Sequence, residues 1–189
     1  MRQPAIAHTE LFSYLVTRHT GRAVRTNIEK QLASFDDAVL AVLDLRGVEL
    51  IDFSCADEIV AKLIVDAPRQ ERRFFLFRGI SERHVEPIES ALSRQGLVAA
   101  AETLAGDPLV LGHIAEEFEH AWRELWHLGA AVPEALADRL SLTREVTSGL
   151  LAELDARALV IRDGGRYVSF GRALRDAPHQ ERRDRDSSI

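Results

Sequence analysis

The sequence predicts an α/β domain with a mixed, largely parallel sheet, followed by a smaller α+β domain. In the first half, short apolar runs of strand length alternate with helical patterns, which is typical of parallel strands joined by crossover helices. From residue 113 onward, helical patterns come first and two short strands come last. We therefore expect an α/β domain over residues 1–112 and a second domain over residues 113–173. Residues 174–189 have almost no apolar content, which predicts a disordered tail.

The strands of the first half are expected where apolar or aromatic residues cluster over a few positions. The segment Ala38–Leu45 is almost continuously apolar, as expected of a strand buried on both faces. The other predicted strands are Leu11–Val16, Arg73–Phe77, Leu97–Thr103 and Pro108–Leu111.

Three helices are expected between these strands. Thr20 is the predicted cap of the first, whose apolar positions recur at helical spacing up to Phe35. The second is expected to open at Ser54, because Ser54 and Asp57 resemble a capping box, and to end before Pro68. The third is expected to begin near Pro87 and to end before a C′ glycine, Gly96.

The second half predicts three helices and a hairpin. The predicted helices are His113–Leu128, Pro133–Leu140 and Thr143–Ala158. The predicted strands are Leu159–Ile161 and Tyr167–Phe170. Between them, Asp163-Gly164-Gly165 can supply the positive φ angles of a tight turn. This order of elements is that of a winged helix-turn-helix.

Three short motifs of the first half occur in a fixed order. They are Leu43-Asp44-Leu45, Gly47-Val48 and Ala56-Asp57-Glu58. In this combination the chain resembles the STAS-like family of uncharacterised bacterial regulators, over roughly residues 10 to 110. The resemblance implies an α/β domain that senses a partner or a modification.

Ser54 is the phosphorylation candidate that this resemblance implies. The wider STAS fold includes anti-sigma-factor antagonists, in which a serine at the corresponding turn is phosphorylated. Here the turn reads Asp52-Phe53-Ser54-Cys55, without the second serine and the glycine of those proteins. A plain N-cap role for Ser54 is the structural alternative. The positive end of the helix dipole would also favour a phosphate at this position.

Three acidic residues lie near this turn: Asp52, Asp57 and Glu58. A structural role explains them better than a catalytic or metal-binding role. Asp57 and Glu58 are adjacent on one helix, so their side chains point about 100° apart and do not easily share one reacting atom. A first turn that complements the helix dipole explains both residues.

Three histidines, His113, His120 and His127, recur every seven residues in the long predicted helix. Successive histidines would lie about 10 Å apart along the helix axis, too far to share one ion. We therefore expect a solvated or interface flank there, and neither a metal nor a cofactor in the protein.

The predicted helix Thr143–Ala158 is the candidate DNA reader. A recognition helix offers its N-terminal polar residues to base edges, so the candidate contacts are Arg144, Thr147 and Ser148. The candidate phosphate contacts of the hairpin are Arg162 and Arg166. However, residues 113–173 contain seven arginines and ten acidic residues, a net charge of −3. Because phosphate contacts dominate affinity, this balance weakens the case for DNA.

Several function classes are disfavoured. The chain has no GxGxxG, P-loop, GxSxG or HExxH motif, so we do not expect an enzyme. Its single cysteine, Cys55, permits no internal disulfide, and neither a signal peptide nor an 18-residue apolar run is present. The net charge of −6 does not suit a nucleic-acid coat. A cytoplasmic protein is expected.

Two functions remain. The first is a signalling-linked transcription regulator, in which the α/β domain senses a partner or phosphorylation and the winged helix passes that state to double-stranded DNA. A monomer and a homodimer are both open for this function. The second is a protein-interaction adaptor in a partner-switching pathway, with a kinase-like ATPase or an anti-sigma-type regulator as partner. The sequence leaves both open.

Overall fold

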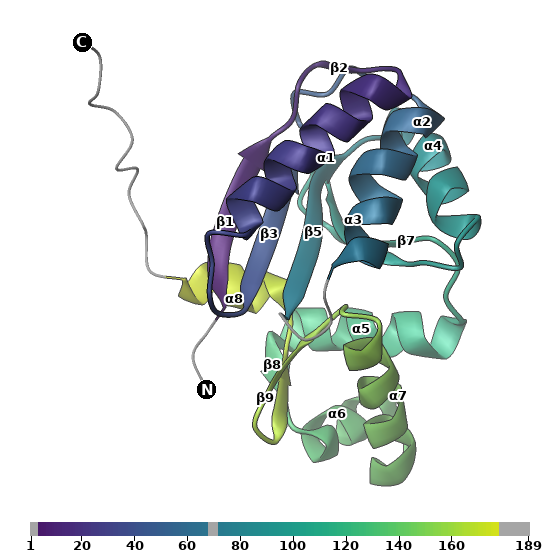
Figure 1. The fold of residues 1–189 in the computed structure, drawn as a ribbon. Coiled ribbons are helices and arrows are strands. Elements are labelled where there is room, and N and C mark those ends of the chain that lie inside the picture. The colour runs from purple at the N-terminus through teal and green to yellow at the C-terminus, as the bar shows by residue number, and fades with distance from the viewer. Residues whose placement is uncertain (1–3, 68–71, 178–189) are drawn as a thin grey trace.

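The computed structural model describes residues 4–67 and 72–177 (Figure 1). Its centre is a five-stranded sheet in the order β1-β3-β5-β6-β7, parallel except for β7. The strands are β1 (Ala5–Glu10), β3 (Val39–Asp44), β5 (Arg73–Ile80), β6 (Ala99–Thr103) and β7 (Pro108–Leu111). The predicted α/β fold with a mostly parallel sheet is therefore confirmed.

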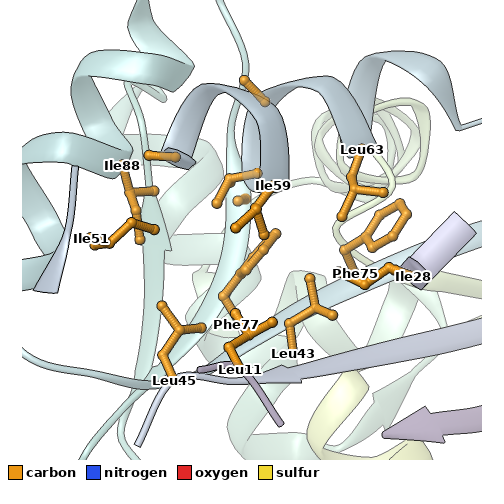
Figure 2. Packing of buried hydrophobic residues seen from close by; sticks show 14 of the residues in the cluster. Leu11, Ile28, Leu43, Leu45, Ile51, Ile59, Leu63, Phe75, Phe77 and Ile88 are labelled. Atoms are coloured by element: carbon orange, nitrogen blue, oxygen red, sulfur yellow. The ribbon is translucent and has the colours of Figure 1, made fainter. Parts of the chain in front are cut away.

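One face of the sheet is covered by helices of the first half (Figure 1). They are α1 (Arg18–Leu32), α2 (Phe53–Ala56), the π-helical segment η1 (Asp57–Ala61), α3 (Lys62–Asp66) and α4 (Glu82–Ser93). Because side chains alternate along a strand, Leu43 and Phe77 point into this core. Figure 2 shows them packed with Ile28, Ile59 and Ile88 from the covering helices.

The second half of the chain covers the other face. Its elements are α5 (Glu116–Leu128), β8 (Ala130–Ala131), α6 (Pro133–Leu140), α7 (Arg144–Ala156), β9 (Ile161–Asp163), β10 (Arg166–Val168) and α8 (Phe170–Asp176). The three short strands form an antiparallel sheet in the order β8-β10-β9. In Figure 1 this half (green to yellow) lies toward the end of the sheet where β5 begins.

A single apolar cluster joins the sheet to the second half. Leu76 of β5 and the fully buried Trp122 of α5 both belong to it. The Phe74 ring packs edge-on against the Phe170 ring, with 5.8 Å between centroids. The buried Trp122 indole donates to the Leu159 carbonyl over 3.1 Å, which satisfies its one polar atom. The predicted division into residues 1–112 and 113–173 remains a prediction, but the two parts share this core.

Two strand predictions in the first half need correction. The edge strand β1 (Ala5–Glu10) was not predicted, because its apolar residues are mostly small and it is polar at one end. Instead, Leu11–Val16 was expected, and within it the structure has the two-residue strand β2 (Tyr14–Leu15). This strand pairs in parallel with β4 (Leu50–Ile51).

Two helix starts also differ from the prediction. Thr17, not Thr20, caps α1, and its side chain accepts from the Thr20 amide. The helix α4 begins at Glu82 and contains Pro87 in its interior, so Pro87 does not mark its first turn. Ser81 precedes this helix, and its amide donates to His84 Nδ1 over 3.2 Å, which fixes the helix start one turn earlier. Pro68 lies outside the described residues.

The end of the chain differs as well. The disordered tail is predicted to start at residue 174, but α8 runs to Asp176, and residues 178–189 lie outside the described residues. Ser169 caps this helix, and the buried Phe170 and Ala173 attach it to the core. These apolar anchors explain why a helix follows the hairpin. In the described part of the chain, no helix is long and apolar enough to cross a membrane.

Candidate functional site

The turn between β4 and α2 is held by the side chain of Asp52. Its Oδ1 accepts from the Cys55 amide at 2.7 Å, and its Oδ2 accepts from the Thr17 amide at 2.9 Å. Asp52 has extended backbone angles and is the N-cap of α2. The predicted cap, Ser54, is instead the second residue of the helix and is partly exposed. The prediction was wrong because the aspartate two residues earlier captures the free amides first.

Thr17 faces this turn in a strained backbone conformation. Its φ is 73°, which is uncommon for a β-branched residue. Two bonds from the turn hold it there, since its amide donates to Asp52 and its carbonyl accepts from Cys55 Sγ at 3.0 Å. Strain of this kind persists only where the surroundings enforce it, and it gathers at functional positions.

A second contact joins the turn to the end of α4. The Arg94 guanidinium lies over the Phe53 ring, 5.3 Å from its centroid. The Gln95 amide approaches Asp57 Oδ1 at 3.5 Å. Arg18 lies on the other side of Asp57, with 2.6 Å between Nη1 and Oδ2. Ser54 is therefore placed one helical turn from a carboxylate that already has cationic and amide partners.

Glu58 is fully buried, yet it is charged. Arg18 Nη1 lies 3.1 Å and Arg25 Nε 3.3 Å from its carboxylate, and Lys62 donates to it as well. Burial alone would raise the pKa of Glu58, but the hydrogen bonds from Lys62 and Arg18 outweigh it and hold this pKa below its ordinary value. The carboxylate therefore links α1 to η1 through charge.

This arrangement corrects the first-turn explanation of Asp57 and Glu58. Both lie at the start of the π-helical segment η1, which continues α2, so the free amides of the helix N-terminus lie a turn earlier, at the Asp52 cap. Their charges are met by Arg18 and Lys62. Among residues 4–67 and 72–177, no group of three or more His, Cys, Asp or Glu side chains is arranged to hold a metal ion. The predicted row of three histidines on one helix is also corrected. His120 and His127 lie on α5, whereas His113 precedes it.

Large apolar side chains are exposed on β2 and β4 and in the loop before β2. Phe12 is 68% exposed, Tyr14 60% and Leu50 50%. Tyr14 and Leu50 are direct neighbours across the β2–β4 pair. We call these three residues the apolar patch. Clusters of exposed apolar side chains on a folded protein often mark an interaction surface.

The candidate DNA contacts of α7 do not share one exposed surface. Thr147 is fully buried, and no described residue gives its hydroxyl a hydrogen-bond partner. In this conformation it does not reach a ligand. Ser148 is half-buried, and Arg144 is exposed with its Nε 2.8 Å from Glu134. Of these three side chains, that of Arg144 is the most exposed.

The two hairpin arginines point to opposite faces of their strands. Arg162 lies opposite Tyr167 in the register, and its guanidinium is 6.0 Å from that ring. Arg166 lies opposite Asp163 and is paired with it at 3.5 Å. Because neighbouring cross-strand pairs alternate between faces, one flat ligand would not meet both side chains in the same way.

Sequence reasoning missed several residues of the site. Thr17 was not expected to cap a helix, and Glu58 was explained as a first-turn charge and not as a buried one. One signal of the burial of Glu58 was present, because Glu58 is followed directly by the apolar Ile59-Val60-Ala61.

A scan against models of known protein families finds no match for this chain. A search of curated proteins finds no similar sequence either.

Proposed function

We propose that the chain is a regulatory protein in which a STAS-like α/β half receives a signal and a winged-helix half passes it to DNA. The element order of the second half of the chain supports the winged-helix assignment. Its order is helix, strand, two helices and two strands, with the strands in one antiparallel sheet. This order supports a winged helix, with α6 and α7 as the helix-turn-helix pair.

The shared core is the observation that carries the proposal. The second face of the sheet has no other cover among the described residues than the second half of the chain. Phe74 and Leu76 therefore touch the helical half directly, while Phe75 and Phe77 of the same strand touch the helices beside the turn. A shift of β5 caused on one face would be felt on the other, because close-packed cores transmit displacement.

The apolar patch and the Ser54 turn are the proposed receiving surface. Ser54 is partly exposed in the first turn of α2, where the helix dipole favours added negative charge. A phosphate there would also meet Asp57, three residues on, and would compete for Arg18. Such competition would weaken the ion pairs that Arg18 makes between α1 and η1. Phosphorylation at Ser54 would in this way change how the two helices pack.

DNA binding is tested by fluorescence anisotropy with duplexes from upstream of the gene and with a pool of random duplexes. We expect binding that weakens steeply with salt. Arg144→Ala should reduce affinity about tenfold. Arg123→Ala, at an exposed and ion-paired position of α5, is the matched control and should have little effect. Undetectable binding at low salt would remove DNA from the proposal.

Modification is tested by Phos-tag electrophoresis of the protein from its native cell, beside a Ser54→Ala variant. A shifted band that Ser54→Ala abolishes is expected. Ser54→Asp should also change the DNA affinity, whereas Ser90→Asp, at an exposed position of α4, should not. The absence of a shifted band under all growth conditions would refute the phosphorylation step.

A second function, a protein-interaction adaptor, is favoured by the surface of α6 and α7. Arg144 is engaged by Glu134, and two apolar side chains, Leu142 and Val146, are 41% and 50% exposed nearby. Val146→Lys separates the two functions, since an added cation should strengthen DNA binding but weaken an apolar protein contact. Leu104→Lys, in the turn between β6 and β7, is the control for a nonspecific charge effect.

A further inference from the structure

The two outermost strands of the central sheet, β1 and β7, differ in how they end it. Among residues 4–67 and 72–177, each of them pairs on one side only. β7 is four residues long and begins with Pro108, which has no amide to donate to a further strand. β1 has six residues with neither lysine nor proline, and its register with β3 runs without a shift. β1 therefore lacks the features that commonly protect an edge strand from pairing with another strand.

The backbone of β1 offers hydrogen-bonding groups along its outer edge. The amides of Ala5 and Leu11 donate to carbonyls on the β3 side. Because successive residues of a strand direct their N–H and C=O groups to opposite sides, the residues directed outward are Ile6, His8 and Glu10. The exposed Gln31 of α1 reaches the His8 carbonyl at 3.4 Å, a long hydrogen bond that a pairing strand could replace.

The side chains along this edge form a self-complementary series. Those of Ile6, His8 and Glu10 lie on one face of the strand, because side chains alternate. Ile6 is partly buried against the core shared with the second half, whereas His8 and Glu10 are exposed. Phe12 follows two residues after Glu10 and is 68% exposed. The order is therefore apolar, imidazole, carboxylate, apolar, so that an antiparallel copy would set a donor against an acceptor and apolar against apolar.

We propose that β1 pairs antiparallel with β1 of a second copy of this chain, with the two Thr9 residues opposite each other. In this register His8 lies opposite Glu10 of the partner subunit. Ile6 lies opposite Phe12 of the partner subunit, and the two apolar side chains cover each other. Each contact occurs twice, because the pair is two-fold symmetric. The two five-stranded sheets then form one continuous sheet.

The side chains and the surroundings of β1 both favour this register. A register centred on His8 or on Glu10 would set like side chains against each other. The centre at Thr9 also lies away from α8, which is near the beginning of β1 (Figure 1). The imidazole donates to a carboxylate without carrying a charge, which suits His8 because burial and the charge of Arg78 lower its pKa. The dimer goes beyond the proposed function and requires neither DNA nor a phosphate.

Sedimentation velocity of the full chain tests the dimer from about 1 µM to about 300 µM. We expect the mass to rise from 21.1 kDa toward twice that value in the upper part of this range, because the contact is small. His8→Glu and Glu10→Arg should each weaken dimerisation about tenfold, since each sets two acceptors or two donors against each other at both symmetric contacts. The double variant exchanges the two groups and should restore the dimer.

Glu86→Arg, at an exposed position of α4, is the matched control for added charge and should change nothing. A single 21.1 kDa species at every concentration would leave the edge to some other partner and would overturn the proposal. So would a dimer that the β1 variants do not weaken, or that the double variant fails to restore.

A cross-link tests the register. The two Thr9 residues would form a non-hydrogen-bonded pair with Cα atoms about 4.5 Å apart, a separation that a disulfide spans. Thr9→Cys should therefore give a disulfide-linked dimer under oxidised glutathione, seen by non-reducing electrophoresis. Ser90→Cys, at an exposed position of α4, is the control and should give far less, and Cys55 is buried. Equal cross-linking of the two variants, or none in Thr9→Cys, would refute the pairing.

Discussion

At the residue scale, Cys55 shows how a reactive group is made inert. Its side chain is buried and donates to the Thr17 carbonyl. Burial, followed by the charge of Asp52, raises the pKa of the thiol to about 11. At pH 8 we therefore expect iodoacetamide to label folded Cys55 at least about a hundredfold more slowly than the denatured chain. Mass spectrometry of quenched samples measures both rates, and similar rates would contradict the described environment.

His84 makes a pH-dependent contribution to stability. It is buried at the start of α4, where Nδ1 accepts from the Ser81 amide and Nε2 lies 2.9 Å from the Val48 carbonyl. This pattern requires a neutral ring with its proton on Nε2. Burial lowers the pKa of His84, and the nearby Arg83 charge lowers it further, against the hydrogen bond to Val48.

The sign of the effect follows from that lowered pKa. Above about pH 6.5 the ring is neutral in both the folded and the unfolded chain, so its contribution is fully present. As the pH falls below this value, the unfolded chain takes up the proton more readily and the free energy of unfolding decreases. Urea unfolding between about pH 7.5 and pH 5 should show this decrease, and His84→Gln should reduce its slope. An unchanged slope would contradict the prediction. His8, whose pKa burial also lowers, supplies part of the remainder.

At the element scale, Gly21 lets α1 approach the helix that follows the turn. A Cβ on Gly21 would lie 2.9 Å from the Cys55 Cα and 3.0 Å from the Glu58 Cβ. Both atoms are fixed to the helix backbone, so neither can move away unless its helix moves. Gly21 is therefore required for the spacing that allows Arg18 and Arg25 to reach Glu58.

Gly21→Ala should destabilise the fold by about 1–3 kcal/mol, because it overpacks this helix contact. Gly149→Ala is the matched control, since its Cβ would enter open space in the middle of α7. That variant should be neutral or stabilising by up to about 1 kcal/mol, because alanine favours helices. Chemical denaturation compares the two. Equal effects would show that the contact at Gly21 is not tight.

At the scale of the whole molecule, the core shared by the sheet and the second half predicts cooperative unfolding. Phe170 is fully buried against Phe74, at the point where α8 returns to the sheet. Phe170→Ala should cost about 3–5 kcal/mol, as is usual for a buried aromatic. Phe12→Ala, at an exposed position, should change stability by no more than about 0.5 kcal/mol.

The probes of this experiment report on different parts of the chain. Both tryptophans, Trp122 and Trp126, lie in α5, so their fluorescence follows the second half. Far-UV circular dichroism follows all helices, including those of the first half. The two transitions should coincide in the wild type and move together in Phe170→Ala. Separate transitions would show that residues 1–112 and 113–173 fold independently.

The sequence by itself determined the periodic elements of this protein. Ala38–Leu45 contains β3, Pro133–Leu140 is α6, and Gly129 ends α5, because continuous apolar runs, an N-terminal proline and a C-terminal glycine act locally. The tertiary structure decided which residues meet. Asp52 replaced Ser54 as the cap, Glu58 became a buried charge between two helices, and Thr147 turned into the core. These outcomes depend on contacts between segments far apart in the chain, and local sequence periodicity does not predict such contacts.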